Sequence, residues 1–417
     1  MTKTTFYAKV CGYLEASKRS ISIMRIAMIG QKGIPIKFGG VERHVESLAV
    51  RLGSTGHQVT VYTRAWYGRS NPNFSVGVRS IVVPTIKTKN LDAIVHTFIA
   101  TLHAIFTGTD IIHYHGVGPS LMSWLPRLLA PRIKVVSTFH CIDRKHQKWG
   151  LFARLMLKLG ERFACTFPHK TIVVSKTLQS YCDNLYPNRT EYIPNGITEP
   201  EAVVEDDGTL ERYGLKPNGY LLMVSRLVRH KGAHYLIEAY KNLKKRRLVG
   251  DLKLVFVGDS AFTNDYVAEI KKMASDDSDI IFTGSLQGAP HDRLFRNSYA
   301  FILPSESEGL PIVILEAMSY GKTVLASDIP ENVEVTRTHG INFRNTDVCD
   351  LEDKLTFLIT NPQLVVRKGA GAKEFVVENY HWDDVARLVD SVYHGLRPQA
   401  EPVEELVAQI PINSFKN

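Results

Sequence analysis

Residues 305–321 have the sequence SESEGLPIVILEAMSYG, and the second half of this stretch is almost wholly apolar. Pro311 suits the first position of a helix and Gly321 suits the residue just past its end, so a helix is predicted between them. Apolar side chains would cover this helix on every side, which predicts that it is buried inside the protein.

Two glutamates flank the start of this helix. Glu316 lies within the apolar run, and Glu308 lies just before it. A buried carboxylate is costly unless hydrogen-bond donors surround it, and vicinal sugar hydroxyls are suitable donors. These donors predict a ligand-binding cleft beside Glu316, and Glu308 is then expected at the mouth of that cleft. The alternative is that Glu308 caps the helix while Glu316 bonds to a backbone amide in the core.

Length and composition indicate how many domains the chain forms and in which cellular compartment it is found. The 417 residues, 44% of them hydrophobic, are enough for two ordinary domain cores. The five cysteines are scattered without CxxC spacing, which argues against a disulfide framework or a zinc site and favours a cytoplasmic protein. No apolar stretch reaches the roughly 18 residues of a membrane-spanning helix.

Charge is divided unevenly between the two halves of the chain. Residues 24–195 carry 22 lysines and arginines against 8 aspartates and glutamates, whereas residues 196–417 carry 25 against 33. A basic first half indicates an anionic partner, which a membrane surface, a phosphate-bearing acceptor or a nucleic acid would each supply.

Short apolar strands alternate with helical patterns along the chain, as in parallel α/β folds. A first series begins at Met24 with MRIAMIG, and a second runs from YLLMVSR to KTVLAS. Residues 1–23 precede the first strand as an extension, and Met24 is an alternative start. We therefore expect two doubly wound sheets in tandem, with ligands bound beyond the carboxyl ends of the strands.

The loops after the strands carry groups that could hold a phosphate. Gly39 and Gly40 precede a helix and let the backbone approach an anionic ligand, although a plain flexible turn explains them equally well. Arg226 ends a strand and Lys231 precedes the next helix, which suits a diphosphate, with ordinary surface cations as the alternative. The second strand ends at Arg64 without the acidic residue of a nicotinamide dinucleotide site.

Taken together, these motifs resemble those of the retaining glycosyltransferases of family 4, also described as glycosyl transferases group 1. The resemblance rests on SRLVRHKG with Arg226 and Lys231, followed by SESEGLP with Glu308 and then Glu316, in that order. It covers about residues 24–395. It implies the GT-B fold, in which two Rossmann-like domains face each other.

The resemblance also implies roles for individual residues. Arg226 and Lys231 would neutralise the donor diphosphate and stabilise it as it leaves. Glu316 would hold the nucleotide ribose, and Glu308 would face the donor sugar. The remaining roles implied in this way are contacts of Gly39, Gly40, Gly309 and Leu310 with the donor, and of His140 with the transferred sugar.

The acceptor side and the metal requirement carry separate expectations. His115 and Ser120, near the end of the strand DIIHYHG, are expected on the acceptor side. Asp277 and Asp279 imitate the metal-binding DxD of another glycosyltransferase fold, but they precede a strand and so lie at the wrong edge of the sheet. We therefore expect a metal-independent site without a cofactor, in which the nucleotide sugar is a substrate.

Two helical segments carry expectations about placement. Residues 145–163 mix apolar side chains with lysines and arginines, so they form either a core-facing helix or a surface that rests on an anionic membrane leaflet, where a lipid-linked acceptor would be presented. By resemblance, a helix at about 381–396 crosses back to the first domain (24–195). The second domain then comprises residues 196–380, and residues 397–417 form a tail.

The sequence thus favours an enzyme that moves a sugar from a nucleotide-diphosphate donor to a saccharide or lipid-linked acceptor, with retention, in the biosynthesis of cell-surface polysaccharide or glycolipid. It would act in the cytoplasm or on the inner face of the cell membrane. Residues 33–42 are also similar to a rhamnosyltransferase-like branch of the family. The alternatives are a GT-B epimerase or phosphorylase, a non-catalytic nucleotide-sugar-binding protein and a nucleic-acid-binding protein. The last is disfavoured because the basic run KNLKKRR has no interleaved aromatics.

Overall fold

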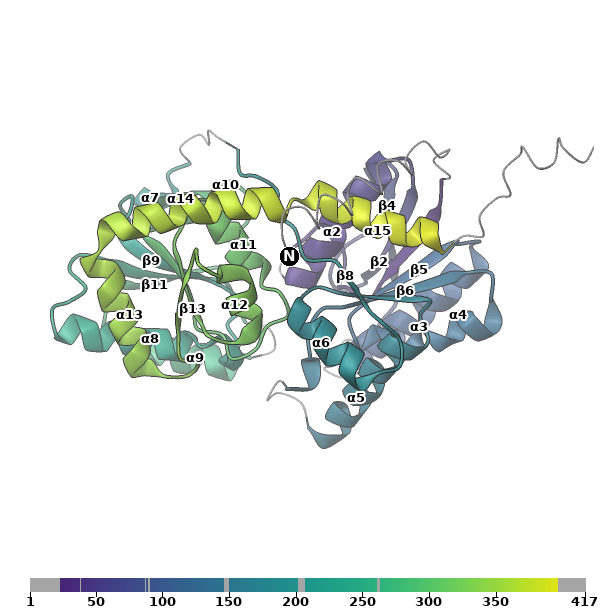
Figure 1. The fold of residues 1–417 in the computed structure, drawn as a ribbon, viewed down its shortest axis with the longest axis horizontal. Helices are drawn as coiled ribbons and strands as arrows, with labels where there is room; N and C mark the ends of the chain where they lie inside the picture. The colour runs from purple at the N-terminus through teal and green to yellow at the C-terminus, as the bar shows by residue number, and fades with distance from the viewer. Residues whose placement is uncertain are drawn as a thin grey trace, which may run out of the picture.

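The computed structural model describes residues 23–37, 39–86, 88, 91–145, 150–201, 207–260 and 263–396. They form two α/β domains that lie next to each other, one from each half of the chain (Figure 1). This confirms the expected architecture of two domains with parallel sheets. The expected N-terminal extension, up to residue 22, and the expected tail lie outside the described residues.

The first domain is built on an eight-stranded sheet with the order β3-β4-β2-β1-β5-β6-β7-β8. Neighbouring strands are parallel except for the antiparallel pair of β3 and β4 at one edge. The strands are β1 (Arg25–Ile29), β2 (Gln58–Arg64), β3 (Asn71–Ser75), β4 (Val78–Val83), β5 (Ile111–His115), β6 (Lys134–Phe139), β7 (Lys170–Val173) and β8 (Glu191–Tyr192).

Helices cover both faces of this sheet, as β1 illustrates. Ile26 and Met28 pack on one face against α2 and α15, while Ala27 and Ile29 pack on the other face against α3. Strands buried on both faces are apolar throughout, which is why their sequences show no alternation. The helices of this domain are α2 (Gly40–Ser54), α3 (Leu91–Phe106), α4 (Trp124–Leu129), α5 (Leu151–Thr166), α6 (Lys176–Leu185) and α15 (Trp382–Gly395), with short 3₁₀ helices η2 (Pro119–Met122) and η3 (Asp143–Lys145).

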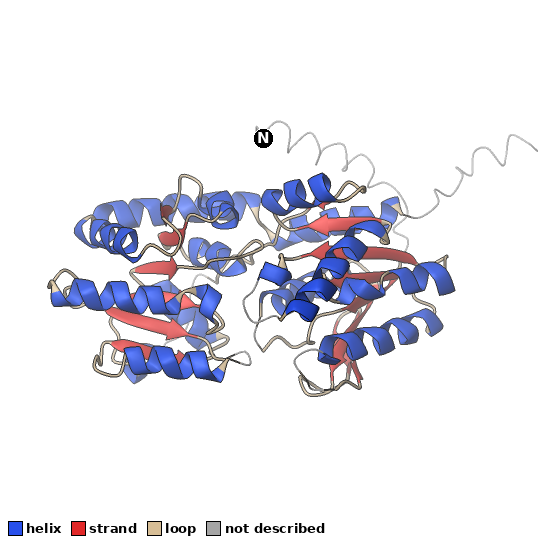
Figure 2. Cartoon of the chain, turned by 90° about the horizontal axis from the view of Figure 1, so that it is seen from below, coloured by secondary structure: helices blue, strands red, loops and turns tan. Residues whose placement is uncertain are grey.

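The second domain is built on a six-stranded parallel sheet with the order β11-β10-β9-β12-β13-β14. Here too helices lie on both sides of the sheet, as Figure 2 shows for both domains. The strands are β9 (Tyr220–Val224), β10 (Lys253–Val257), β11 (Ile280–Gly284), β12 (Ala300–Leu303), β13 (Val324–Ser327) and β14 (Ile341–Phe343).

The helices of the second domain complete two apolar layers. Leu221 and Met223 of β9 pack with α8, whereas Tyr220 and Leu222 pack on the other face with α11. The helices are α7 (Thr209–Arg212), α8 (Ala233–Lys245), α9 (Asn264–Met273), α10 (Ala289–Asn297), α11 (Ile312–Ser319), α12 (Pro330–Thr336), α13 (Val348–Thr360) and α14 (Pro362–Asn379), with the 3₁₀ helix η4 (Arg229–Lys231).

The predicted apolar helix is α11, and its side chains are almost all buried. It begins at Ile312, one residue later than expected, because Pro311 has the extended conformation of a cap. Gly321 follows the helix with a φ of +70°, a conformation that glycine adopts without strain.

The C-terminal helix α15 returns to the first domain, where it packs beside α2 (Figure 1). Trp382, Val385 and Val389 lie in the core of that domain. The chain leaves the first domain at Gly196, where a Cβ would lie only 2.7 Å from the Trp382 ring. The two crossings between the domains therefore lie in contact.

Membrane crossing and cysteine pairing were both argued against from the sequence. Among the described helices, none has the length and apolar character that crossing a bilayer requires. Cys141, Cys165, Cys182 and Cys349 are free thiols.

Candidate active site

A cleft of about 780 Å³ lies between the two domains. Both domains contribute to its wall, with α2 and the loop after β6 on one side and the loops after β9 and β12 on the other. The structure brings to this cleft every residue for which a donor or catalytic role was expected, namely Gly39, Gly40, His140, Arg226, Lys231, Glu308, Gly309, Leu310 and Glu316.

Lys231 reaches the cleft because the chain turns sharply before α8. Gly232 has a φ of +74°, and a Cβ on it would overlap the main-chain carbonyl of Pro304. The loops after β9 and β12 therefore lie against each other, and the amide of Glu306 donates to the His230 carbonyl at 2.8 Å. This close approach sets Lys231 beside the loop that carries Glu308.

Lys231 and Glu308 form an ion pair in this wall. Lys231 Nζ lies 2.5 Å from Glu308 Oε1, and the two side chains are 13% and 8% exposed. A pair this shielded from water is stronger than a surface pair. Arg226 lines the same wall, and in the described part of the chain it has no ion-pair partner. Among the described residues, its positive charge is therefore not neutralised by an ion pair.

Glu316 is paired across the cleft with Arg43 of α2. The donors for this half-buried carboxylate thus come from the other domain of the protein itself. Burial lowers the pKa of Arg43, against the opposing attraction of Asp292 and other neighbours. Sequence reasoning missed Arg43, although its position three residues after Gly40, at the start of a helix that faces the cleft, was an available signal.

Glycines allow the two walls to approach closely. Gly309 lies against the main chain of His140, and a Cβ on Gly309 would overlap the His140 carbonyl oxygen. Gly39 has a φ of +109° at the cap of α2, where a side chain would also meet the Glu42 carboxylate. Gly40 has open space around it, so the backbone here is accessible to a ligand.

His140 follows β6 and lines the cleft with 8% of its surface exposed. Burial, together with repulsion from His44 and His113, holds its pKa well below the usual value. His140 is therefore neutral at physiological pH, and one ring nitrogen donates while the other accepts.

Comparison with known proteins identifies the family of the chain. The model of Glycosyltransferase Family 4 matches residues 38–199, and the model of Glycosyl transferases group 1 matches residues 211–375. The chain belongs to the family 4 glycosyltransferases. This enzyme has the GT-B fold and transfers glycosyl groups.

Relatives illustrate the family. The glycosyltransferase is 26% identical over 393 residues to the GDP-mannose-dependent alpha-(1-6)-phosphatidylinositol monomannoside mannosyltransferase of Mycobacterium tuberculosis, covering 87% of this chain and 96% of that one. It is 30% identical over 230 residues to an Escherichia coli UDP-Gal:alpha-D-GlcNAc-diphosphoundecaprenol alpha-1,3-galactosyltransferase, covering 54% and 59%. Its fold matches that of sucrose-phosphate synthase from Thermosynechococcus elongatus with a TM-score of 0.75 and 18% identity, covering 89% and 98%.

The two residues expected on the acceptor side of this glycosyltransferase do not reach the cleft. Ser120 is fully buried, and its hydroxyl bonds to the Gly116 carbonyl and to Ser137 Oγ. His115 is 2% exposed and lies behind His140. The expectation of cleft-facing side chains at these positions is therefore corrected, because η2 turns Ser120 inward and His140 covers His115.

Asp277 and Asp279 of the glycosyltransferase have a structural role. Lys244 Nζ lies 2.5 Å from Asp277 Oδ1 and 2.6 Å from Asp279 Oδ2. Both aspartates precede β11, at the end of the sheet away from the cleft. These two aspartates, which imitate a DxD motif, therefore stabilise a turn through ion pairs with Lys244.

Sequence reasoning also missed Asn195, which connects the two domains of the glycosyltransferase. Its amide donates to the Leu310 carbonyl at 2.7 Å, and its side-chain oxygen lies 2.9 Å from Nδ1 of His44. Asn195 lines the cleft and is 4% exposed. The Asn-Gly pair at residues 195–196 is typical of a turn, but the long-range partners of Asn195 leave no local signal in the sequence.

Proposed function

We propose that this glycosyltransferase binds a nucleotide-diphosphate sugar in the interdomain cleft and transfers the sugar, with retention, to a saccharide or lipid-linked acceptor. The observation that carries the proposal is the convergence of Arg226, Lys231, Glu308 and Glu316 on one wall of the cleft, facing His140. Such a transfer belongs to the biosynthesis of cell-surface polysaccharide or glycolipid.

The two cations supply the electrostatic part of the reaction. Breaking the bond between sugar and phosphate develops negative charge on the diphosphate, and preorganised positive groups stabilise that charge more than they stabilise the ground state. Arg226 would contribute a guanidinium that has no ion-pair partner in the described part of the chain, and Lys231 an ammonium held in place by Glu308. Two fixed cations at the leaving group support a metal-independent transfer, without a cofactor.

The remaining groups would orient the donor. Glu316 would accept hydrogen bonds from the ribose hydroxyls. These hydroxyls would replace Arg43, which is paired with the Glu316 carboxylate in the absence of the donor. Glu308 would face the sugar, and the main chain at Gly309 and Leu310 would bind sugar or phosphate oxygens, with Gly39 and Gly40 opposite. Neutral His140 would hydrogen-bond a hydroxyl of the transferred sugar. In front-face substitution the leaving phosphate takes the proton of the acceptor hydroxyl.

A membrane surface is proposed as the place of the reaction, on the basis of α5. Leu151, Phe152 and Leu155 are 86%, 77% and 64% exposed, so the first half of this helix does not face the core as the alternative interpretation required. Arg154 and Lys158 are exposed on the same stretch. Trp149 and Lys148, which contributed to the expectation, lie outside the described residues.

Exposed apolar and basic side chains together favour an anionic lipid leaflet. Relatives named for a phosphatidylinositol mannoside and a diphosphoundecaprenol acceptor support a lipid-linked acceptor for this chain. The proposed location is therefore peripheral, on the cytoplasmic face of the cell membrane, and no nucleic-acid partner is proposed.

The test is to measure nucleotide release from a panel of UDP, GDP, dTDP and ADP sugars with and without membrane-extracted acceptor lipids. Transfer predicts that release depends on the acceptor and that the product keeps the anomeric configuration of the donor, as read by NMR. Acceptor-independent conversion would favour an epimerase or phosphorylase instead. Donor binding without any turnover would favour a non-catalytic binding protein.

A further inference from the structure

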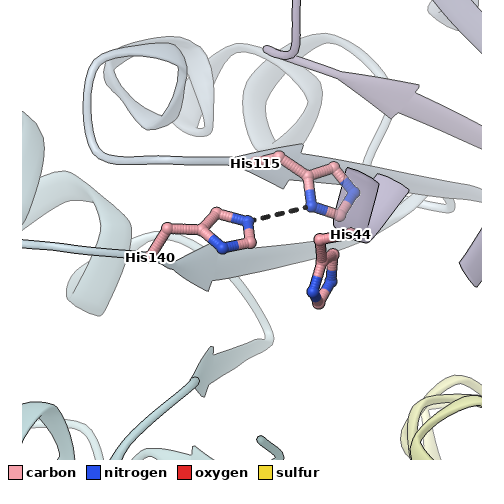
Figure 3. Close-up of side chains that lie close together, drawn as sticks. All are labelled: His44, His115 and His140. Carbon is pink, nitrogen blue, oxygen red and sulfur yellow. Dashed lines mark hydrogen bonds between the residues drawn. The ribbon is translucent and has the colours of Figure 1, made fainter. Parts of the chain in front are cut away.

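Three histidines meet at the cleft wall of the first domain. His44 lies on α2, His115 ends β5, and His140 directly follows β6 (Figure 3). Each offers a ring nitrogen, and these nitrogens all lie within 4.8 Å of one another. We propose that these three side chains, here called the histidine cluster, bind a divalent transition-metal ion such as Zn²⁺.

Hydrogen bonding prepares His44 as a ligand. The Asn195 amide nitrogen donates to the Leu310 carbonyl, so the Asn195 oxygen faces His44 Nδ1 at 2.9 Å and accepts a hydrogen bond from it. His44 Nε2 then carries a lone pair, and it is buried without a hydrogen-bond partner among the described residues. Metal-binding histidines are commonly oriented in this way, by a hydrogen bond from the ring nitrogen that does not bind the metal.

The spacing of the other two rings fits a metal ion better than a hydrogen bond. His115 Nδ1 and His140 Nε2 are 3.4 Å apart, which is long for a hydrogen bond between nitrogens. Two ligands on a tetrahedral ion with bonds of about 2.05 Å are separated by roughly 3.3–3.4 Å.

The chemistry of the cluster selects the class of ion. Three imidazoles without a carboxylate suit Zn²⁺, Co²⁺, Ni²⁺ or Cu²⁺ rather than Mg²⁺ or Ca²⁺. Burial lowers the pKa of His44 to about 4, and burial, with repulsion from neighbouring histidines that include His113, holds the pKa values of His115 and His140 well below the usual value. Neutral rings offer their lone pairs to a metal at physiological pH.

The cleft gives an ion a route to the cluster. His140 lines the cleft, whereas the other two rings lie behind it, so the fourth coordination position would open toward the cleft. Because His140 is also proposed to contact the donor sugar, an ion would compete with the donor for it. This competition rests on the proposed function. Metal binding itself is measured without donor or acceptor, so its test does not depend on the proposed function.

The test is a titration of the full-length protein, free of any histidine tag, with Co²⁺. His57, Asp390 and His394 form a second group of possible ligands, so the titration uses a His394→Ala background. We expect one Co²⁺ per chain, with the intense visible absorption of a four-coordinate site. Folded His44→Gln and His115→Gln variants should bind Co²⁺ at least about 10-fold to 100-fold more weakly. Loss of a residue that only hydrogen-bonds to a metal ligand already has an effect of this size.

The control is His339→Gln in the second domain, which should keep full affinity. Failure of the folded His394→Ala protein to bind Co²⁺, or a weak six-coordinate spectrum, would overturn the proposal. Unchanged affinity in folded His44→Gln and His115→Gln, or equal weakening in His339→Gln, would overturn it as well. Should the cluster variants unfold, the absorption spectrum of the His394→Ala protein decides the question by itself.

Discussion

Arg43 on α2 and Glu316 on α11 form an ion pair that spans the cleft between the two domains. Their side chains are 33% and 16% exposed. Since Glu316 is the carboxylate proposed to hold the nucleotide ribose, Arg43 occupies it before the donor arrives. Donor binding then exchanges one set of hydrogen-bond donors on Glu316 for another.

Glu316→Ala should weaken donor binding, whereas Arg43→Gln should leave it unchanged or tighten it. Hydrogen bonds to a charged group contribute about 1.5–3 kcal/mol each, which corresponds to roughly a 10-fold to 100-fold loss of affinity in Glu316→Ala. Isothermal titration with the preferred nucleotide sugar measures both. A similar loss in Arg43→Gln would show that Arg43 binds the donor instead of competing with it.

Lys231→Ala and Glu308→Ala should each abolish most turnover while the protein stays folded. Loss of one preorganised charge-stabilising group typically lowers kcat by about 10²-fold to 10³-fold. The control is Glu269→Ala, because its pair with Arg229 lies nearby but is 43–45% exposed and contributes little. Steady-state kinetics with circular dichroism check the expectation, and wild-type rates in both cleft variants would rule out the assigned roles.

Gly309→Ala should impair transfer through geometry alone. A methyl group there overlaps the His140 carbonyl, so the loop must move away from the first domain. We expect at least about a tenfold lower kcat, since small displacements of positioning groups are costly. Gly118→Ala is the control, because a Cβ at that position meets no atom within 4 Å. Equal activity of the two variants would contradict the close approach.

Phe152→Ser combined with Leu155→Ser should weaken binding to anionic vesicles. Burying each such side chain in the lipid contributes about 1.5–3 kcal/mol. The affinity for vesicles, measured by co-sedimentation, should therefore fall by at least about tenfold. Val366→Ser in the second domain is the control, because Val366 is 73% exposed but lies away from α5. If the wild-type protein shows no preference for anionic over zwitterionic vesicles, the membrane proposal fails.

Acid should destabilise the protein through buried His96. Burial, and then the nearby positive charge of Arg64, lower the pKa of His96 to about 4, against the opposing effect of Asp92. The unfolded chain, with a histidine pKa of about 6.5, binds the proton more readily, so stability is lost as pH falls from about 6.5 toward 4. His96 accounts for up to about 3 kcal/mol of this loss. His96→Leu should show a shallower fall of Tm with acid, and identical pH profiles would contradict this.

The fold could be predicted because its signals are local. Strands such as β1 are apolar on both faces, and the glycines at residues 39 and 321 have positive φ values that mark the ends of helices. In parallel sheets the loops after the strands share one edge. Arg226, Lys231 and Glu308 could therefore be assigned to one cleft without knowing how the two domains are oriented.

The missed residues depend on that orientation. Arg43 meets Glu316, and Asn195 meets Leu310, only because the two domains face each other at short range. His44 is a single histidine on an amphipathic helix, and nothing in its sequence neighbours indicates two further histidines beside it. Ser120 was misplaced because a single 3₁₀ turn, η2, decides whether its hydroxyl points to the cleft or inward.

The contact between the two chain crossings governs how the domains can move. Ile197 and His381 form a parallel bridge, with hydrogen bonds from the Ile197 amide to the Tyr380 carbonyl at 2.6 Å and from the Trp382 amide to the Ile197 carbonyl at 3.1 Å. Because both crossings are joined at this point, we expect any rotation of one domain relative to the other to pivot there. We therefore expect the parts of each domain far from this contact to be displaced most when the cleft opens for substrate entry or product release.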